Sequence, residues 1–221
     1  IVGNGPVALE SNGTITGVKN LHVAQNRIIK LHEQARTGNL INATGVLQFA
    51  NLKFNSGSSM IMEGDTELNL VVGFISIKFS ALLSAHRIRI LASKVDVEVG
   101  AVLSCSGGIS TKISAGPVKV QQLPMGAGAG HASSGGRGSG GDGGTYYGSL
   151  YNPLQPGRSG GSGHGGTSGG NGGGYIFIET GNEVVNDGII SAAGGDAKSD
   201  SGGGGGSGGS VQIKTQLFTG M

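Results

Sequence analysis

Apolar residues alternate with polar ones through the first half of the chain, in short bursts separated by polar or glycine breaks. A period of two puts successive side chains on opposite faces of a β-strand. The bursts follow one another too closely for helices to lie between them, so the pattern predicts many short strands. Residues 21–35 have some helical character, which we interpret as strands with a short irregular piece. The bursts are Leu47/Phe49, Leu52/Phe54, Met60/Met62, Leu68/Leu70/Val72, Ile75/Ile77/Phe79, Ile88/Ile90 and Val95/Val97/Val99.

An internal repeat favours one of two all-β architectures for these strands. Residues 88–108 align without a gap over residues 175–195, and residues 211–220 begin a third copy that stops partway. In the alignment Val102-Leu103-Ser104 matches Ile189-Ile190-Ser191. Units that repeat and stack are typical of a solenoid. We therefore expect a parallel β-helix with three strands per coil, and a β-sandwich with a glycine-rich lobe is the alternative.

Glycine is concentrated in the second half, where most of the 47 glycines lie between Met125 and Val211. A flexible linker is one interpretation of such a segment. The tyrosines and prolines of residues 145–156 are unusual in a spacer, and glycine strands without Cβ atoms can pack closely. We expect packed polyglycine-II-like strands, with the linker as the alternative. The expected parts are a strand-rich solenoid over 1–125, a glycine-rich insertion over 126–174 and glycine-rich β-helix repeats over 175–221.

Four segments carry a resemblance to a known group of proteins. They are GGRGSGGDGGTYYGSLYNPLQPGRSGG (135–161), GGGYIFIE (172–179), GIISAAGGD (188–196) and GGGGSGGSVQIKT (203–215). Together they resemble large extracellular and surface glycine-rich proteins in which parallel β-helix coils are interrupted by glycine-rich insertions. A weaker resemblance is to the polyglycine-II packing of viral tail-tip adhesins. The resemblance implies an extracellular or cell-surface location and a structural or adhesive role, without catalytic residues.

Composition and charge exclude several classes of function. A net charge of +2 with 13% charged residues leaves no basic stripe for nucleic acid. The longest apolar run, residues 70–77, is far short of the roughly 18 residues of a membrane-spanning helix. A single cysteine, Cys105, excludes a disulfide scaffold.

No pattern in the sequence indicates a catalytic, cofactor or metal site. Residues 157–161 fit G-x-S-x-G literally, but the nucleophile elbow needs a strand before it and a helix after it. Asp96 and Glu98 are the only carboxylates placed like a catalytic pair, and we interpret them as a solvated strand face. The acidic residues of the glycine-rich half are too dispersed for a calcium site. We expect a protein that is not an enzyme and has no cofactor.

The expected function is a structural protein that assembles end to end into filaments or a matrix, with itself as partner. An unfinished last repeat leaves strand edges that invite pairing with another chain. The expected assembly edge is Val211, Ile213, Leu217 and Phe218, and Asn12 and Asn42 are possible glycosylation sites. The alternative is a surface adhesin or tail-fibre-type module that recognises glycans or a receptor. Its expected ligand contacts are Tyr146, Tyr147 and Tyr151.

Overall fold

The computed structural model describes residues 7–8, 20–23, 28–31, 46–62, 67–107, 123–197 and 202–221. Over these residues the chain is all-β, with parallel strands in two sheets and one short 3-10 helix, η2 (His164–Gly166). None of the described residues belongs to a helix long and apolar enough to cross a membrane. The strands are β1 (Val7–Ala8), β2 (Asn20–Val23), β3 (Ile28–Leu31), β4 (Val46–Phe54), β5 (Ser59–Met62), β6 (Glu67–Ile77), β7 (Leu82–Ser84), β8 (Arg87–Val97), β9 (Val102–Ser104), β10 (Tyr175–Asn186), β11 (Ile189–Ser191), β12 (Ser210–Lys214) and β13 (Leu217–Thr219).

The chain forms two compact units, each built from separate segments of sequence. Unit 1 consists of Ile1–Ser104, Phe177–Ser191 and Ile213–Met221. Unit 2 consists of Cys105–Ile176 and Ala192–Gln212, and so contains the whole of the glycine-rich segment 126–174.

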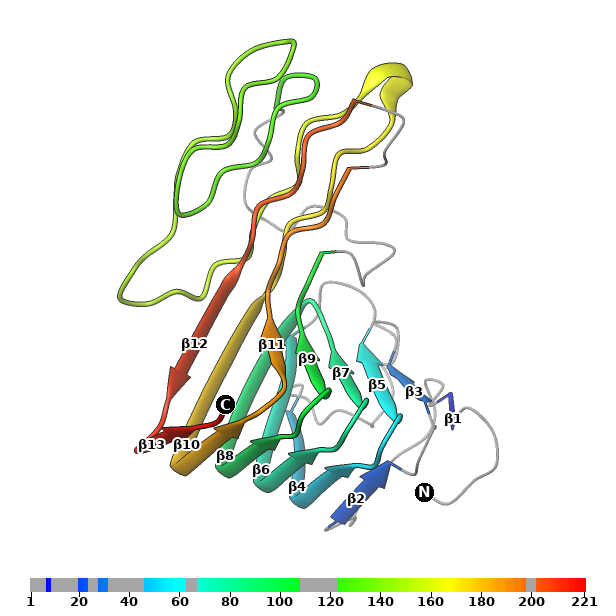
Figure 1. Ribbon diagram of the computed structural model, residues 1–221, viewed down its shortest axis with the longest axis vertical. Helices are drawn as coiled ribbons and strands as arrows, with labels where there is room; N and C mark the ends of the chain where they lie inside the picture. Colours follow the sequence, from blue (N-terminus) through cyan, green and yellow to red (C-terminus); the bar gives the residue numbers. More distant parts are fainter. Residues whose placement is uncertain are drawn as a thin grey trace. The chain divides into compact units, whose positions relative to one another are not determined.

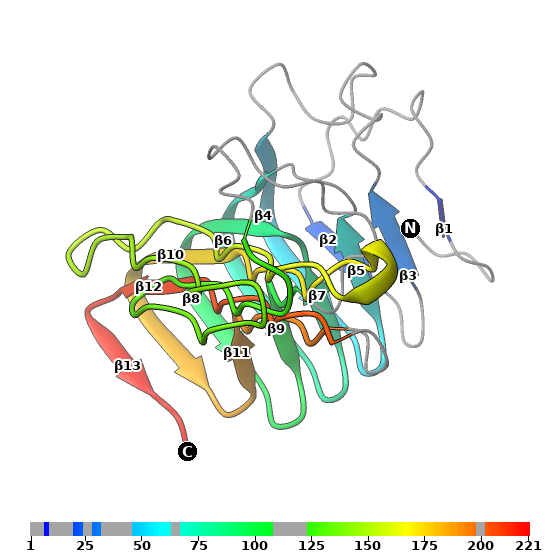
Figure 2. The ribbon, with the colours of Figure 1, turned by 90° about the horizontal axis from the view of Figure 1, so that it is seen from above.

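The strands alternate between the two sheets along the sequence (Figures 1 and 2). One sheet has six strands in the order β1-β3-β5-β7-β9-β11. The other has seven, in the order β12-β10-β8-β6-β4-β2, with β13 also paired to β10. Neighbouring strands such as β4 and β6, or β7 and β9, pair in parallel. The strands expected within residues 21–35 are confirmed as β2 and β3.

Along the sequence, a long strand of the seven-stranded sheet is followed by a short strand of the six-stranded sheet, so the repeating unit has two strands and not the three expected from the sequence. The reason is that neighbouring bursts merge into one long strand. In β6 the buried positions run through Leu70 and Val72 and resume, out of phase, at Ile75. Between them lies Gly73, where a Cβ would be 2.6 Å from the carbonyl oxygen of Ala50 on β4. Because of this phase change, the apolar side chains of both halves of β6 face the interior. Two bursts of the sequence therefore form one strand.

Stacked apolar side chains form the interior of unit 1. In the seven-stranded sheet Leu52, Ile75 and Val95 are register partners, and all three are fully buried. In the six-stranded sheet Leu83 and Leu103 are likewise paired and fully buried. Full burial of one such side chain stabilises a fold by about 1.5–3 kcal/mol. Burial of these columns therefore contributes to the cohesion between successive strands.

Four-residue turns connect the long strands to the short ones, and their third residue has a positive φ. These residues are Gly57 (φ 70°), Ser80 (φ 58°) and Gly100 (φ 72°). The left-handed region favours glycine, so Ser80 is the exception in the series. The apolar residues Phe79 and Val99, expected inside strands, lie in these turns and are exposed. That part of the strand prediction was wrong, because β6 and β8 end at Ile77 and Val97.

The internal repeat is confirmed where the short strands meet. β11 pairs with β9 in the register Ile189–Val102, Ile190–Leu103 and Ser191–Ser104, as the gapless alignment predicts. The alignment does not hold at the preceding turn. Asp187 N–H donates to Val97 O (2.8 Å), in the way that Glu98 N–H donates to Ile77 O (3.0 Å). Asp187 thus takes the position of Glu98, and its turn is shorter than the turn after β8.

Unit 2 is held together by glycine segments that exchange backbone hydrogen bonds around a triangle. Gly160 N–H donates to Gly170 O, Gly170 N–H donates to Gly204 O, and Gly204 N–H donates to Gly161 O, each at 2.9 Å. Each of the three segments therefore donates to one neighbour and accepts from the other. In Figure 1 these extended segments run alongside one another.

The same arrangement of three hydrogen bonds recurs three residues away on each of the three segments. Gly157 N–H donates to Gly173 O (2.7 Å), Gly173 N–H to Ser207 O (2.9 Å), and Ser207 N–H to Arg158 O (3.0 Å). Three residues is the period of an extended polyproline II chain. Residues 128, 135 and 144 close another triangle, with Gly128 N–H bound to Gly136 O, Gly135 N–H to Gly144 O and Gly144 N–H to Gly128 O.

Candidate functional site: an open strand edge and a tyrosine loop

The last strands of unit 1 present an edge that no further strand covers in the described residues. β11 ends the six-stranded sheet, and at the end of the seven-stranded sheet β13 pairs with β10, as does β12, of which only residues 213–214 belong to unit 1. Unpaired N–H and C=O groups on such an edge can accept another strand. The side chains of Ile189, Leu217 and Phe218 are about half exposed there.

Phe218 occupies an interior position at this edge. Its register partner is Val184 on β10, which is 0% exposed, whereas Phe218 is 53% exposed. The two residues lie in the same column, and among the described residues no strand lies on the outer side of Phe218. A residue of the next strand at that position would complete the burial of the ring.

Polar contacts fix β13 against β10. Thr180 donates its hydroxyl to the hydroxyl of Thr215 (2.7 Å), which in turn donates to Leu217 O (2.9 Å). At the other end of β13, Met221 N–H donates to the carboxylate of Asp187 (2.9 Å). The edge is therefore a preformed strand and not a loose segment, which lowers the entropy cost of pairing it with another strand.

The four residues expected at the assembly edge are placed unequally. Leu217 and Phe218 belong to β13 in unit 1, and both are exposed. Ile213 belongs to unit 1 and is half-buried. Val211 belongs to unit 2 and is exposed. Ile189, which lies on the edge strand of the six-stranded sheet, was missed by the sequence analysis, although its match to Val102 in the repeat could have identified it.

A loop of unit 2 projects two apolar side chains. Leu150 is 91% exposed and Tyr151 is 95% exposed, and Tyr146, just before the loop, is 74% exposed. The tip is shaped by Ser149, whose hydroxyl accepts hydrogen bonds from the N–H groups of Tyr151 (3.3 Å) and Asn152 (3.1 Å). Leu150 is not among the ligand contacts expected from the sequence, because the tyrosine pattern identifies aromatic residues alone.

Tyr147 differs from the other two tyrosines because it closes the base of this loop. Its hydroxyl donates to Pro156 O (2.7 Å). The guanidinium carbon of Arg158 lies 4.1 Å from the ring centroid, and the ring of His131 lies 4.7 Å away. Burial raises the pKa of the Tyr147 phenol, while the Ser207 hydroxyl and the Arg158 charge act in the opposite direction. Tyr147 therefore positions the loop that carries Leu150 and Tyr151.

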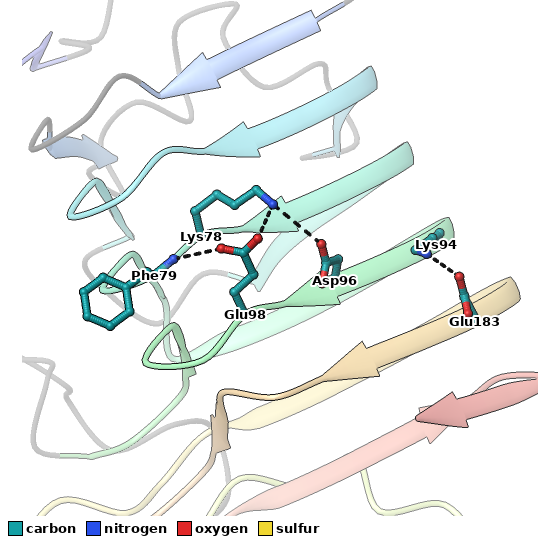
Figure 3. Close-up of polar contacts among 6 residues, drawn as sticks. All are labelled: Lys78, Phe79, Lys94, Asp96, Glu98 and Glu183. Atoms are coloured by element: carbon teal, nitrogen blue, oxygen red, sulfur yellow. Dashed lines mark hydrogen bonds and ion pairs between the residues drawn. The ribbon is translucent and has the colours of Figure 1, made fainter. Parts of the chain in front are cut away.

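The carboxylates Asp96 and Glu98 face a lysine on the neighbouring turn (Figure 3). Lys78 forms an ion pair with Glu98 and lies 3.9 Å from Asp96, measured between Nζ and the carboxylate oxygen. The other oxygen of Glu98 accepts a hydrogen bond from Phe79 N–H (3.3 Å). Glu98 thus ties one four-residue turn to the next, which is a structural task.

A second ion pair on the same face joins Lys94 of β8 to Glu183 of β10 (Figure 3). The hydrogen bond to Glu183 raises the pKa of the Lys94 ammonium above its usual 10.5, with desolvation opposing and the charges of Glu183 and Asp96 assisting. Both groups are partly exposed, so the pair contributes to strand register more than to stability.

Among the described residues, no group of three or more His, Cys, Asp or Glu side chains could hold a metal ion. Asp142 pairs with Arg137 (3.3 Å), and Asp187 binds the backbone of Met221. The possible glycosylation sites Asn12 and Asn42 lie outside the described residues.

Comparison with protein-family models, with curated proteins and with solved structures finds no match.

Proposed function

We propose that this chain is a non-enzymatic extracellular structural protein that assembles end to end into filaments or a matrix. In this proposal it is a parallel β-solenoid with a lobe of packed polyglycine-II-like strands. The observation that carries the proposal is the half-exposed Phe218 ring, which continues the fully buried position of Val184 at an open strand edge.

The solenoid part of the proposal rests on the order and direction of the strands. Successive strands alternate between two sheets, and their neighbours pair in parallel. A β-sandwich is built from antiparallel strands joined by hairpins and Greek-key connections, so parallel pairing favours the solenoid. Buried columns of like residues, such as Leu52, Ile75 and Val95, are the packing expected of stacked coils.

The polyglycine-II part rests on close backbone contact. A Cβ on Gly160 would lie 2.1 Å from Gly204 O, and one on Gly170 would lie 2.0 Å from Gly195 O. Such distances leave room for hydrogen at Cα and for nothing larger. With the three-residue period of the hydrogen bonds, they favour a packed lobe over a loose linker.

Assembly at the strand edge has a favourable apolar component. Burying the exposed half of Phe218 is worth about 1 kcal/mol, and Leu217 and Ile189 add comparable areas on or beside the same edge. Backbone hydrogen bonds to a new strand fix the direction of pairing. The partner in this proposal is another copy of the chain, with surface glycans as possible further partners and neither nucleic acid nor membrane insertion involved.

The test compares two apolar-to-charged variants of the full chain. Phe218→Asp places a charge in the interior column at the edge, and Leu150→Asp places one on the exposed loop of unit 2 as the matched control. Sedimentation velocity and electron microscopy over a concentration range should give filaments or large species for the wild type and Leu150→Asp, and small species for Phe218→Asp. A wild type that stays monomeric at high concentration would refute the proposal.

A second candidate function, a surface adhesin, is favoured by the loop that exposes Leu150 and Tyr151. Aromatic faces and hydroxyls of this kind suit glycans or a receptor protein. The variants Tyr146→Ala and Tyr151→Ala should abolish binding to a glycan array while thermal unfolding stays unchanged. Leu217→Ala, which removes an exposed apolar side chain of unit 1, is the control, and its glycan binding should be retained. Absence of any glycan bound by the wild type would exclude the glycan form of this function.

A further inference from the structure

Two extended segments of unit 2 pair with each other through one side of their peptide groups. The segments are residues 155–162 and 203–209. Gly204 N–H donates to Gly161 O (2.9 Å), and Ser207 N–H donates to Arg158 O (3.0 Å). A trans peptide group holds its N–H and its C=O on opposite sides. The other ends of the four peptide groups in these two bonds therefore point away from the pair.

On segment 155–162 the outward ends are two N–H groups, those of Ser159 and Ser162. They belong to the same peptide groups as Arg158 O and Gly161 O, which accept the bonds from segment 203–209. Both serines are exposed, and no described residue accepts a hydrogen bond from either N–H. The segment thus presents two unpaired donors that lie three residues apart.

On segment 203–209 the outward ends are two carbonyl groups, Gly203 O and Gly206 O. No described residue donates a hydrogen bond to either oxygen. Between them lies Gly205, which is exposed and has no heavy atom within 4 Å of its Cβ position. The segment thus presents two unpaired acceptors at the same three-residue spacing, with open space beside them.

The unpaired donors of one segment are complementary to the unpaired acceptors of the other. Three residues is the period of an extended polyproline II chain, so both groups of such a pair can bond at once. Within one copy the two segments already pair through the opposite ends of the same peptide groups. A segment 155–162 from a second copy can therefore add to the open side of segment 203–209, and the chain of hydrogen bonds then continues from copy to copy.

The direction of the added segment is not restricted by this geometry. Segment 155–162 runs antiparallel to segment 203–209, because the lower-numbered donor Gly204 bonds the higher-numbered acceptor Gly161. Gly170 and Gly173, in contrast, donate to Gly204 and Ser207 in the same order, so that their segment runs parallel. Glycine segments of unit 2 thus bond in both directions, and the shared three-residue spacing is what the contact requires.

We propose that unit 2 carries a second assembly contact, in which Ser159 and Ser162 N–H of one copy donate to Gly203 O and Gly206 O of another. It goes beyond the proposed function, because it lies in unit 2 and does not involve the strand edge at Phe218. The contact joins two different surfaces, so each copy can bind a neighbour on either side. Two backbone hydrogen bonds make a weak contact, but many of them along two filaments act together and would link filaments side by side.

Removal of one donor tests the contact in the full-length Phe218→Asp variant, which lacks end-to-end assembly in the proposed function. Ser159→Pro removes the N–H and keeps the φ of a polyproline II chain, whereas the matched control Ser159→Ala removes only the hydroxyl. Sedimentation velocity over a concentration range should show weak association of the Phe218→Asp protein. Ser159→Ala should leave it unchanged, and Ser159→Pro should weaken it by about tenfold or more. Equal association of the two variants would overturn the inference.

A steric variant tests the acceptor side independently. Gly205→Leu fills the open space beside Gly203 O and Gly206 O without a clash inside its own copy. The matched control is Gly181→Leu in unit 1, where the Cβ position is also free of neighbours within 4 Å. Gly205→Leu should weaken the association by about tenfold or more, and Gly181→Leu should not change it. Unchanged association of Gly205→Leu would overturn the inference.

Amide hydrogen exchange does not depend on the folding of these variants. In the Phe218→Asp protein, the N–H groups of Ser159 and Ser162 should exchange fast in dilute solution and slowly when the protein is concentrated. Gly160 and Gly161 N–H, which are bonded within the copy (2.9 and 2.7 Å), should be protected at every concentration. Protection three residues apart is specific to a polyproline II partner, since a β-strand protects alternate residues. Association without slower exchange of the two serines would overturn the inference.

The failure of this contact and the failure of the proposed function give different results. A Phe218→Asp protein that stays monomeric at every concentration overturns the contact in unit 2, while wild-type filaments leave the proposed function intact. Wild-type protein that associates through Ser159 and Gly205 but forms no filaments overturns the proposed function and supports this contact.

Discussion

Gly204 and Ala127 approach each other so closely that a Cβ on Gly204 would lie 1.9 Å from the carbonyl oxygen of Ala127. The next residue, Gly205, has no heavy atom within 4 Å of its Cβ position. Two adjacent glycines on one segment thus differ completely in their surroundings. At Gly204 the lack of a Cβ is needed for close packing, whereas at Gly205 it is not.

Gly204→Ala should therefore destabilise unit 2, while Gly205→Ala should not. The first change forces backbone apart inside the hydrogen-bonded triangles, at a cost of at least about 1–3 kcal/mol. The second should change stability by no more than about 1 kcal/mol, in the stabilising direction if its backbone suits alanine. Chemical denaturation followed by amide hydrogen exchange in unit 2 measures both. Equal effects of the two substitutions would mean that the close packing is absent.

Ser80→Gly should stabilise unit 1 by about 0.5–1 kcal/mol. Ser80 has φ 58° in a turn whose counterparts are Gly57 and Gly100, and the left-handed conformation costs a non-glycine residue roughly 1–2 kcal/mol. Part of the gain is lost to the greater chain entropy of glycine in the unfolded state. The control is Ser56→Gly, at a position without a positive φ, where stability should fall. Thermal unfolding distinguishes the two signs.

Tyr147→Phe should loosen the loop of unit 2 by about 0.5–1.5 kcal/mol, because Pro156 O loses its donor. The raised pKa of Tyr147 also predicts a pH dependence. Since the folded pKa exceeds the unfolded value, the contribution is complete below pH 10 and declines as the pH rises through the folded pKa. Tyr147→Phe should lack this alkaline decline, whereas Tyr146→Phe, at an exposed ring, should retain it. Denaturation at increasing pH is the measurement.

Leu103→Ala should cost about 2–5 kcal/mol, because the side chain is fully buried in the column between Leu83 and Ile190. The matched control is Leu150→Ala, whose side chain is 91% exposed, and its effect should stay within about 0.5 kcal/mol. Urea denaturation gives both values. A small effect of Leu103→Ala would argue against a packed column.

The alternation of apolar residues predicts most strands well, because period-two burial is a local property of the sequence. Leu68, Leu70 and Ile75 were all correctly placed in buried strand positions. The alternation does not reveal that two bursts join into one strand at Gly73, because that depends on the carbonyl of Ala50 from another strand. It also misplaces Phe79 and Val99, since a turn can carry an apolar residue on its outer side without breaking the pattern.

The candidate site was predicted only in part. The repeat indicates that Leu217 and Phe218 belong to its third copy, but the exposure of Phe218 against the burial of Val184 requires the register of β10 and β13. The three tyrosines are equivalent in sequence. Only the contacts of Tyr147 with Pro156 and Arg158 separate the residue that closes the loop from those that it presents.

The sequence by itself determined that the chain is all-β and where its strands repeat, because alternation and self-similarity are encoded in neighbouring residues. The tertiary structure decided which segments become neighbours and with what register. Those choices depend on contacts between residues far apart in the chain, such as the ion pair between Lys94 and Glu183 and the triangles that join residues 160, 170 and 204.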